Sequence, residues 1–321
     1  MKNRIIAVVA LVLAMVMCLA SCGGVSKLTM GTGGPTGTYY GFGGILGRYI
    51  EQETGITTVA VSTDGSKANI LGIKDGDYQL GTVQSDVMAY AWAGTSTFAT
   101  DGAVKSFRVI GGLYAEAVQL ITTDPEVQTV ADLAGKKVSI GAPNSGVYYN
   151  AIDVLAAVGL TEQDINAQYQ SFGDSVDSLK DGNISAAFIV AGAPTPAVTE
   201  LMMNTNVDAR LVPIDGEVAA TIMENCPYYT TYSIPANSYN GQTEAVTTIT
   251  VKATMIVSAD LDEDTVYKIT KAIYDNKDAI AAEHAKGLEL TLENATEGMT
   301  APFHKGAARY FAEKGITVNA E

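Results

Sequence analysis

The sequence predicts an α/β protein of two similar lobes with a ligand cleft between them. The main support is an internal repeat. Two strand-like segments, residues 28–31 and 138–142, each lead into a turn of small residues, a Tyr-Tyr pair and a helix-like stretch. Each copy is followed by a Lys-Asp-Gly triplet, at residues 74–76 and 180–182. Alternating strands and helices of this kind are typical of mostly parallel sheets.

In the first half of the chain, β-branched runs predict strands and a 3.6-residue apolar period predicts helices. The clearest helix begins at Tyr40, and Ile45, Leu46, Tyr49 and Ile50 share one of its faces. The expected strands cover residues 28–31, 57–62, 79–83, 108–111 and 117–123, and the expected helices cover 40–54, 66–73 and 87–92.

The second half repeats the alternation. Gly159 follows a helical stretch and suits the left-handed conformation that ends a helix. The expected strands cover residues 138–141, 168–171, 186–190, 210–214 and 247–258, and the expected helices cover 148–158, 175–180, 198–204, 264–275 and 306–314.

The long β-branched run at residues 247–258 predicts that the chain returns to the first lobe near its end. Lobe 1 is therefore expected to be discontinuous, formed by residues 28–120 and 245–321, and lobe 2 by residues 121–244. The strands near 117–123 and 247–258 are the expected hinges.

The start of the chain predicts export. Lys2 and Arg4 precede an apolar run at 5–17 that is short for a membrane span, and residues 1–21 are expected to be a signal peptide. Residues 19–22, Leu-Ala-Ser-Cys, resemble the bacterial lipobox, in which the cysteine becomes the lipidated first residue. Cys22 is thus the expected anchor, residues 22–27 form a tether, and the protein is expected outside the cytoplasm, held at the cell membrane. An ordinary signal peptide is the alternative.

Cysteine usage fits this location. Cys18 would leave with the signal peptide and Cys22 would carry lipid, so Cys226 would have no intramolecular disulfide partner. We expect Cys226 to be a partly buried structural thiol.

The net charge of −15 excludes nucleic acid as a partner, because such a surface repels phosphates. It does not exclude a small anion, since local N–H groups override a distant net charge. A helix N-terminus has free N–H groups and a positive dipole end, and each copy of the repeat directs one toward the expected cleft.

The loop at residues 31–37 is glycine-rich but fits neither nucleotide motif. It has no Gly-Lys-Ser/Thr, and Thr36 stands where a dinucleotide fingerprint needs glycine. We expect ligand contact here and at other strand ends. The candidate ligand-binding residues are Gly33, Gly34, Thr36, Thr38, Tyr39, Asn69, Gln84, Ser85, Asn144, Ser145, Gly146, Tyr148, Ala191, Gly192 and Thr195.

Arginine is absent from all these loops: beyond the signal peptide the chain has only Arg48, Arg108, Arg210 and Arg309. A carboxylate ligand would then be held by N–H groups, hydroxyls and amides. No catalytic motif occurs, and the two histidines, His284 and His304, favour structural roles. We expect no catalytic residue, metal or cofactor.

Several segments, in order along the chain, resemble the TAXI family of TRAP-transporter solute receptors. They cover residues 31–40 (GTGGPTGTYY), 84–86, 131–143, 191–195, 213–217, 234–236 and 302–307. The resemblance implies a type II periplasmic-binding-protein fold, a monomer that delivers its ligand to TRAP membrane permease subunits, and ligands such as glutamate-like amino acids or dicarboxylates. Lys67 departs from the family pattern.

Two alternatives remain open from sequence: a receptor that serves an ABC importer or a histidine kinase, and an enzyme on the same fold. The enzyme needs a nucleophile or base in the cleft, and the sequence offers none that stands out.

Overall fold

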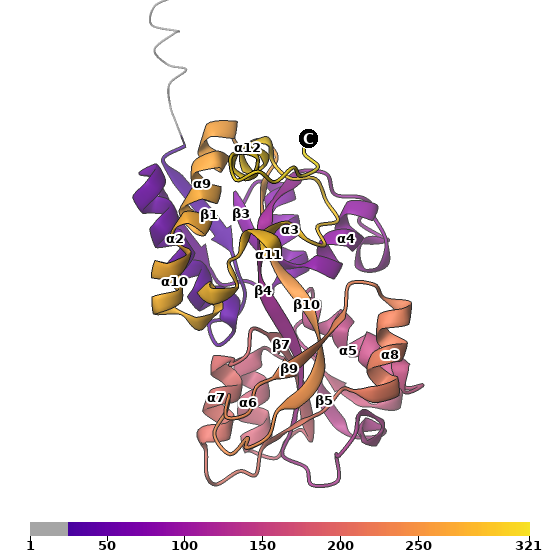
Figure 1. The fold of residues 1–321 in the computed structure, drawn as a ribbon. Helices are drawn as coiled ribbons and strands as arrows, with labels where there is room; N and C mark the ends of the chain where they lie inside the picture. Colours follow the sequence, from indigo (N-terminus) through magenta and orange to yellow (C-terminus); the bar gives the residue numbers. More distant parts are fainter. Residues whose placement is uncertain (1–24) are drawn as a thin grey trace, which may run out of the picture.

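The computed structural model describes residues 25–321, which form two α/β lobes linked by long strands (Figure 1). The expected signal peptide and Cys22 lie outside the described residues. Within residues 25–321, none of the helices combines the length and the apolar character needed to cross a membrane.

Lobe 1 begins with three parallel strands, in the order β2-β1-β3, and the helices between them (Figure 1). The C-terminal helices pack onto the same lobe, where α9 contacts both α2 and α12. Its elements are β1 (Lys27–Gly31), α2 (Thr38–Thr54), β2 (Thr57–Val61), α3 (Ser66–Asp75), β3 (Leu80–Gln84), α4 (Ser85–Ala93), α9 (Glu263–Asp275), α10 (Lys277–Glu283), α11 (Leu292–Thr296) and α12 (Lys305–Glu313).

Lobe 2 has the same arrangement, with the strand order β6-β5-β7. Sequence analysis missed α8 and β9, which follow the repeat. The elements are β5 (Lys137–Ser139), α5 (Gly146–Ala157), β6 (Asn166–Gln168), α6 (Phe172–Lys180), β7 (Ala186–Ala191), α7 (Pro196–Met203), β8 (Arg210–Val212), α8 (Gly216–Asn225) and β9 (Thr230–Ile234).

The repeat seen in the sequence is thus a repeat of topology. In each lobe the first strand lies between the second and the third. The Lys-Asp-Gly triplets end the corresponding helices, α3 and α6. Gly76 and Gly182 have φ of 85° and 67°, a left-handed conformation that glycine adopts without steric cost.

Two long antiparallel strands, β4 (Phe107–Thr122) and β10 (Val246–Ser258), run through both lobes (Figure 1). The prediction of two separate strands at 108–111 and 117–123 is therefore wrong. Gly111 and Gly112 keep the extended backbone, and their missing side chains make room for α9 and α11. A methyl group at Gly111 would overlap the Tyr274 hydroxyl, and one at Gly112 would overlap the carbonyl of Asn294.

The apolar cores follow the lobes. One core joins residues from both ends of the described chain, such as Leu28, Phe42, Ile256 and Phe311. Two further cores lie in lobe 2 and use only residues between Ala117 and Val251. The buried residues of the cores do not overlap, while β4 and β10 are continuous through both lobes and Tyr90 packs against a core of each lobe.

Candidate ligand-binding site

A cavity of about 90 Å³ lies between the lobes, beyond the carboxyl ends of β1, β3, β5 and β7. This is the position at which open α/β sheets bind ligands. The lining residues are Gly33, Gly34, Gly37, Thr38, Tyr39, Thr63, Asp64, Gly65, Ser66, Gln84, Glu116, Ala142, Ser145, Gly146, Val147, Gln170, Ser171, Phe172, Val190 and Ala191.

Four helices begin at this cavity. The first residues of α2, α3, α5 and α6, which are Thr38, Ser66, Gly146 and Phe172, all belong to the lining. The positive ends of four helix dipoles therefore meet at one place. Neither lysine nor arginine occurs among the lining residues of the described chain. The cavity can thus hold an anionic group through backbone N–H groups alone.

The start of α2 has no side-chain cap, because its N-cap residue is Gly37. The Thr38 hydroxyl instead donates to the carbonyl of Gly192 in lobe 2, at 2.9 Å. The first N–H groups of α2 are left to the cavity.

The start of α5 is different, since Ser145 caps it. The Ser145 hydroxyl accepts a hydrogen bond from the Tyr148 N–H at 3.3 Å and donates to the carbonyl of Ala142 at 2.6 Å. The next residue, Gly146, lies against the side chain of Gln84 in lobe 1, and a methyl group there would overlap the amide oxygen of Gln84. This helix end is therefore used for contact between the lobes.

Glu116, on β4, is the one buried carboxylate in the cavity lining of the described chain, with 2% of its surface exposed. Its Oε1 atom has no hydrogen-bond partner within residues 25–321. Burial raises the pKa of Glu116 to about 8, and the charge of Asp86 adds to the shift. The nearby Tyr39 hydroxyl, the Gln84 amide and the charge of Lys286 oppose it.

A buried polar network beside Glu116 connects the lobes. Gln84 Nε2 donates to Asn150 Oδ1 at 2.9 Å, and Asn150 Nδ2 donates to Asp86 Oδ2 at 3.0 Å and to the Tyr229 hydroxyl at 2.6 Å. The Tyr229 hydroxyl donates to Asp153 at 2.8 Å. Burial raises the pKa of Asp86 to about 7.

Many of the candidates from sequence lie together at the cavity. Those that line it are Gly33, Gly34, Thr38, Tyr39, Gln84, Ser145, Gly146 and Ala191. Thr36 and Asn144 lie outside the lining, but their carbonyl groups accept hydrogen bonds across the cleft, from Ala197 N at 3.1 Å and Lys67 N at 3.2 Å.

The other candidates have structural contacts outside the lining. Asn69 donates to the carbonyls of Thr32 and Thr82, and the Ser85 hydroxyl accepts from the N–H of Lys252. The Tyr148 hydroxyl donates to Glu162. Thr195 donates to the carbonyl of Gly192, which itself lies against Thr38 and Tyr114.

Sequence reasoning missed Glu116 and Gln170. Glu116 stands between two alanines in a long apolar strand, and that isolated charge was the available signal. Gln170 and Ser171 were assigned to a strand, but β6 ends at Gln168 and Ser171 caps α6. The segments at 62–65 and 172–174 also follow strands, and Thr63, Asp64, Gly65 and Phe172 from them line the cavity.

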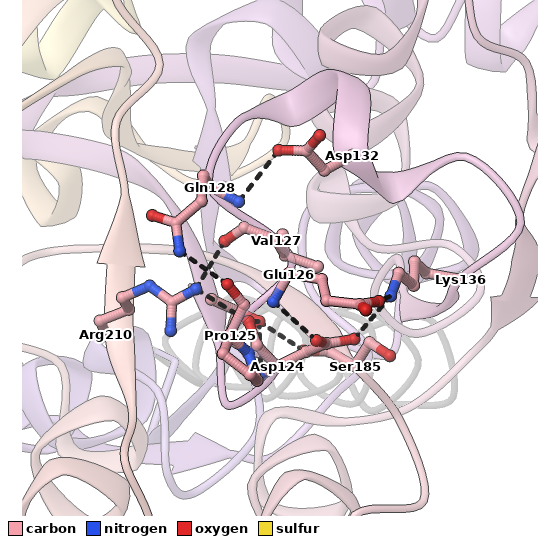
Figure 2. Close-up of polar contacts among 10 residues, drawn as sticks. Asp124, Pro125, Glu126, Val127, Gln128, Asp132, Lys136, Ser185 and Arg210 are labelled. Carbon is pink, nitrogen blue, oxygen red and sulfur yellow. Dashed lines mark hydrogen bonds and ion pairs between the residues drawn. The ribbon is translucent and has the colours of Figure 1, made fainter.

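The cations that sequence analysis considered have partners elsewhere. Lys67 pairs with Asp101 at 2.7 Å, and Arg108 lies near Glu321 at 3.6 Å. Arg210 donates to the carbonyls of Asp124 and Val127 in a loop of lobe 2 (Figure 2). These contacts are structural.

Fold and cavity together define the class: a solute-binding protein with the type II periplasmic-binding-protein fold, which is the predicted fold. The chain belongs to the NMT1-like family, whose model matches residues 30–315. This family agrees with the TAXI resemblance.

Solved structures support the fold. An ancestral arginine-binding protein bound to arginine is 14% identical, with a TM-score of 0.52 over 80% of this chain and 97% of that one. A putative L-cystine ABC transporter from Listeria monocytogenes is 15% identical, with a TM-score of 0.52 over 81% and 95%. A protein from Bordetella bronchiseptica is 15% identical, with a TM-score of 0.53 over 89% of both chains.

Proposed function

We propose that this protein is the receptor of a TAXI-type TRAP transporter, which captures a small carboxylate-bearing ligand by lobe closure and delivers it to a membrane permease. The observation that carries the proposal is the convergence of four helix N-termini on a cavity without lysine or arginine in its lining. Helix N-termini bind anionic groups, and a carboxylate is one of them.

Closure about β4 and β10 is supported by the contacts that cross the cleft. Thr38 with Gly192, Ala197 with Thr36, and Lys67 with Asn144 join the two lobes through single hydrogen bonds. Such contacts are weak enough to break and re-form, at about 0.5–1.5 kcal/mol each. In this proposal, the ligand stabilises the closed form through its differential affinity for that form.

A panel of amino acids, monocarboxylates and dicarboxylates tests ligand capture by thermal denaturation. A ligand at a hundred times its dissociation constant stabilises the folded protein by about 2.7 kcal/mol. If no carboxylate in the panel raises the melting temperature, the proposal is wrong.

Delivery is tested separately, in vesicles that contain the adjacent permease. We expect uptake that requires this receptor and an ion gradient but no ATP. ATP-dependent uptake would instead indicate an ABC importer, and ligand-dependent phosphorylation of a kinase would indicate a sensor.

The proposed lipid anchor is tested by labelling with radioactive palmitate, which should be lost in Cys22→Ala. Light scattering tests the proposed monomer.

A further inference from the structure

We propose that the ligand carries a protonated amino group, which the Glu116 carboxylate and Gln84 Oε1 bind, so that the receptor takes an amino acid in preference to an oxo acid or dicarboxylate without an amine. This inference rests on the proposed function and names the class of ligand within it. It comes from the polar atoms of the cavity that lack partners.

Four oxygen atoms in the lining have no hydrogen-bond partner within residues 25–321: Glu116 Oε1, Gln84 Oε1, Gln170 Oε1 and the Tyr39 hydroxyl. Glu116 and Gln84 are each 2% exposed. A buried acceptor without a donor is destabilising. The Tyr39 hydroxyl can donate to only one of the three acceptors, so the lining has an excess of acceptors that a ligand with several N–H donors would satisfy.

The orientation of the Gln84 amide is fixed by its neighbours. Tyr229 gives its hydroxyl proton to Asp153, so its oxygen accepts from Asn150 Nδ2. Asn150 Oδ1 must then face Gln84 Nε2. A flipped Gln84 would place two oxygens against each other, so Oε1 is the atom that is left without a partner.

The orientation of the Gln170 amide is also set by a neighbour. Its Nε2 atom donates to the Ser178 hydroxyl at 2.9 Å, which leaves Oε1 free. An ammonium group has three donors and one positive charge, and it matches a carboxylate and amide oxygens in the same cavity lining. The carboxylate of the same ligand would lie at the helix N-termini. The lining thus holds acceptors for the ammonium group and free N–H groups for the carboxylate of a zwitterion.

A ligand without an amine fits this arrangement less well. Glu116 could bind a second carboxylate only in its protonated form, as the donor of one hydrogen bond. That proton satisfies one oxygen, and the ligand would bring further acceptors toward Gln84 and Gln170. The other titratable groups that act on Glu116 are Asp86, Tyr39 and Lys286, and Lys286 is already paired with Glu289 at 2.7 Å.

Calorimetry with matched pairs of amino and oxo acids tests the inference. The pairs are alanine and pyruvate, leucine and 4-methyl-2-oxopentanoate, aspartate and oxaloacetate, and glutamate and 2-oxoglutarate. We expect the amino member of the best-binding pair to bind at least tenfold more tightly than its oxo partner. Glu116→Gln should remove at least tenfold of the affinity for the amino acid.

Asp77→Asn is the control, because Asp77 is an exposed carboxylate outside the cavity lining. It should change affinity by less than twofold, and thermal denaturation of each variant confirms folding. Equal or tighter binding of the oxo acids, or a loss in Asp77→Asn as large as in Glu116→Gln, overturns this inference and leaves the proposed function standing. If no carboxylate binds, the proposed function itself fails.

Discussion

The N-termini of α2 and α5 have similar sequences but make different contacts in the structure. The start of α2 has only Gly37 as its N-cap, and it leaves its first N–H groups open to the cavity. The start of α5 is capped by Ser145 and lies against Gln84. In the proposed function, lobe 1 offers Glu116 and the open end of α2 to the ligand, and lobe 2 closes over it.

The largest effect is expected from Gly146→Ala at the start of α5. The added methyl group would overlap the Gln84 amide oxygen, so the lobes could not close fully. We expect at least a hundredfold loss of affinity in calorimetry, with a melting temperature near that of the wild type. Gly41→Ala in α2 is the control, since nothing lies within 4 Å of its added methyl group. Equal affinities of the two variants would refute the closing role of α5.

The pH dependence of binding tests the role of lobe 1. The pKa of Glu116 is about 8 without ligand, and an ammonium group binds the carboxylate. Affinity for an amino acid should therefore rise by about tenfold per pH unit below about pH 8. Ionisation of Asp86, whose pKa is about 7, should also raise the affinity as pH rises. The difference between the wild type and Glu116→Gln therefore isolates the contribution of Glu116. Affinity that falls as pH rises would mean that protonated Glu116 binds the ligand.

Glu116 should also determine how the stability of the ligand-free protein depends on pH. The Glu116 pKa is raised from 4.5 to about 8 on folding, so the folded state holds more protons between these values. The free energy of unfolding should fall by a few kcal/mol as pH rises through this window. Urea titrations of Glu116→Gln should give a flatter profile, with the variant more stable than wild type above pH 8. Parallel profiles would contradict this account.

The smallest effects are expected from removing the hydroxyl groups of Thr38 and Ser145, one at the start of each helix. Thr38→Val removes the hydrogen bond to Gly192 across the cleft and should weaken binding by about twofold to tenfold, as expected for one hydrogen bond. Ser145→Ala removes a cap and should lower the free energy of unfolding by about 1 kcal/mol, with less change in affinity. The reverse pattern would mean that the capped end of α5 binds the ligand.

The repeat, the lobes and the helix ends could be predicted because each depends on local patterns of apolar residues, glycines and caps. Gly146 was found through its resemblance to the first copy. Glu116 was not found, because its role depends on β4 and β10 crossing between the lobes, and the two separate strands predicted at 108–111 and 117–123 left residue 116 outside both. Distant parts of the chain also supply partners to Asn69, which donates to the carbonyl of Thr32, and to Thr195, whose hydroxyl accepts from Gln119 Nε2.

Closure of lobe 2 over lobe 1 is measured most directly by the distance between spin labels on the two lobes. Tyr40 in α2 and Tyr169 after β6 are exposed and lie outside the cavity lining, and Cys226→Ser removes the buried thiol. With labels at positions 40 and 169, a ligand that raises the melting temperature should convert a broad distance distribution into a shorter, narrow one. The same distribution with and without that ligand would contradict capture by closure.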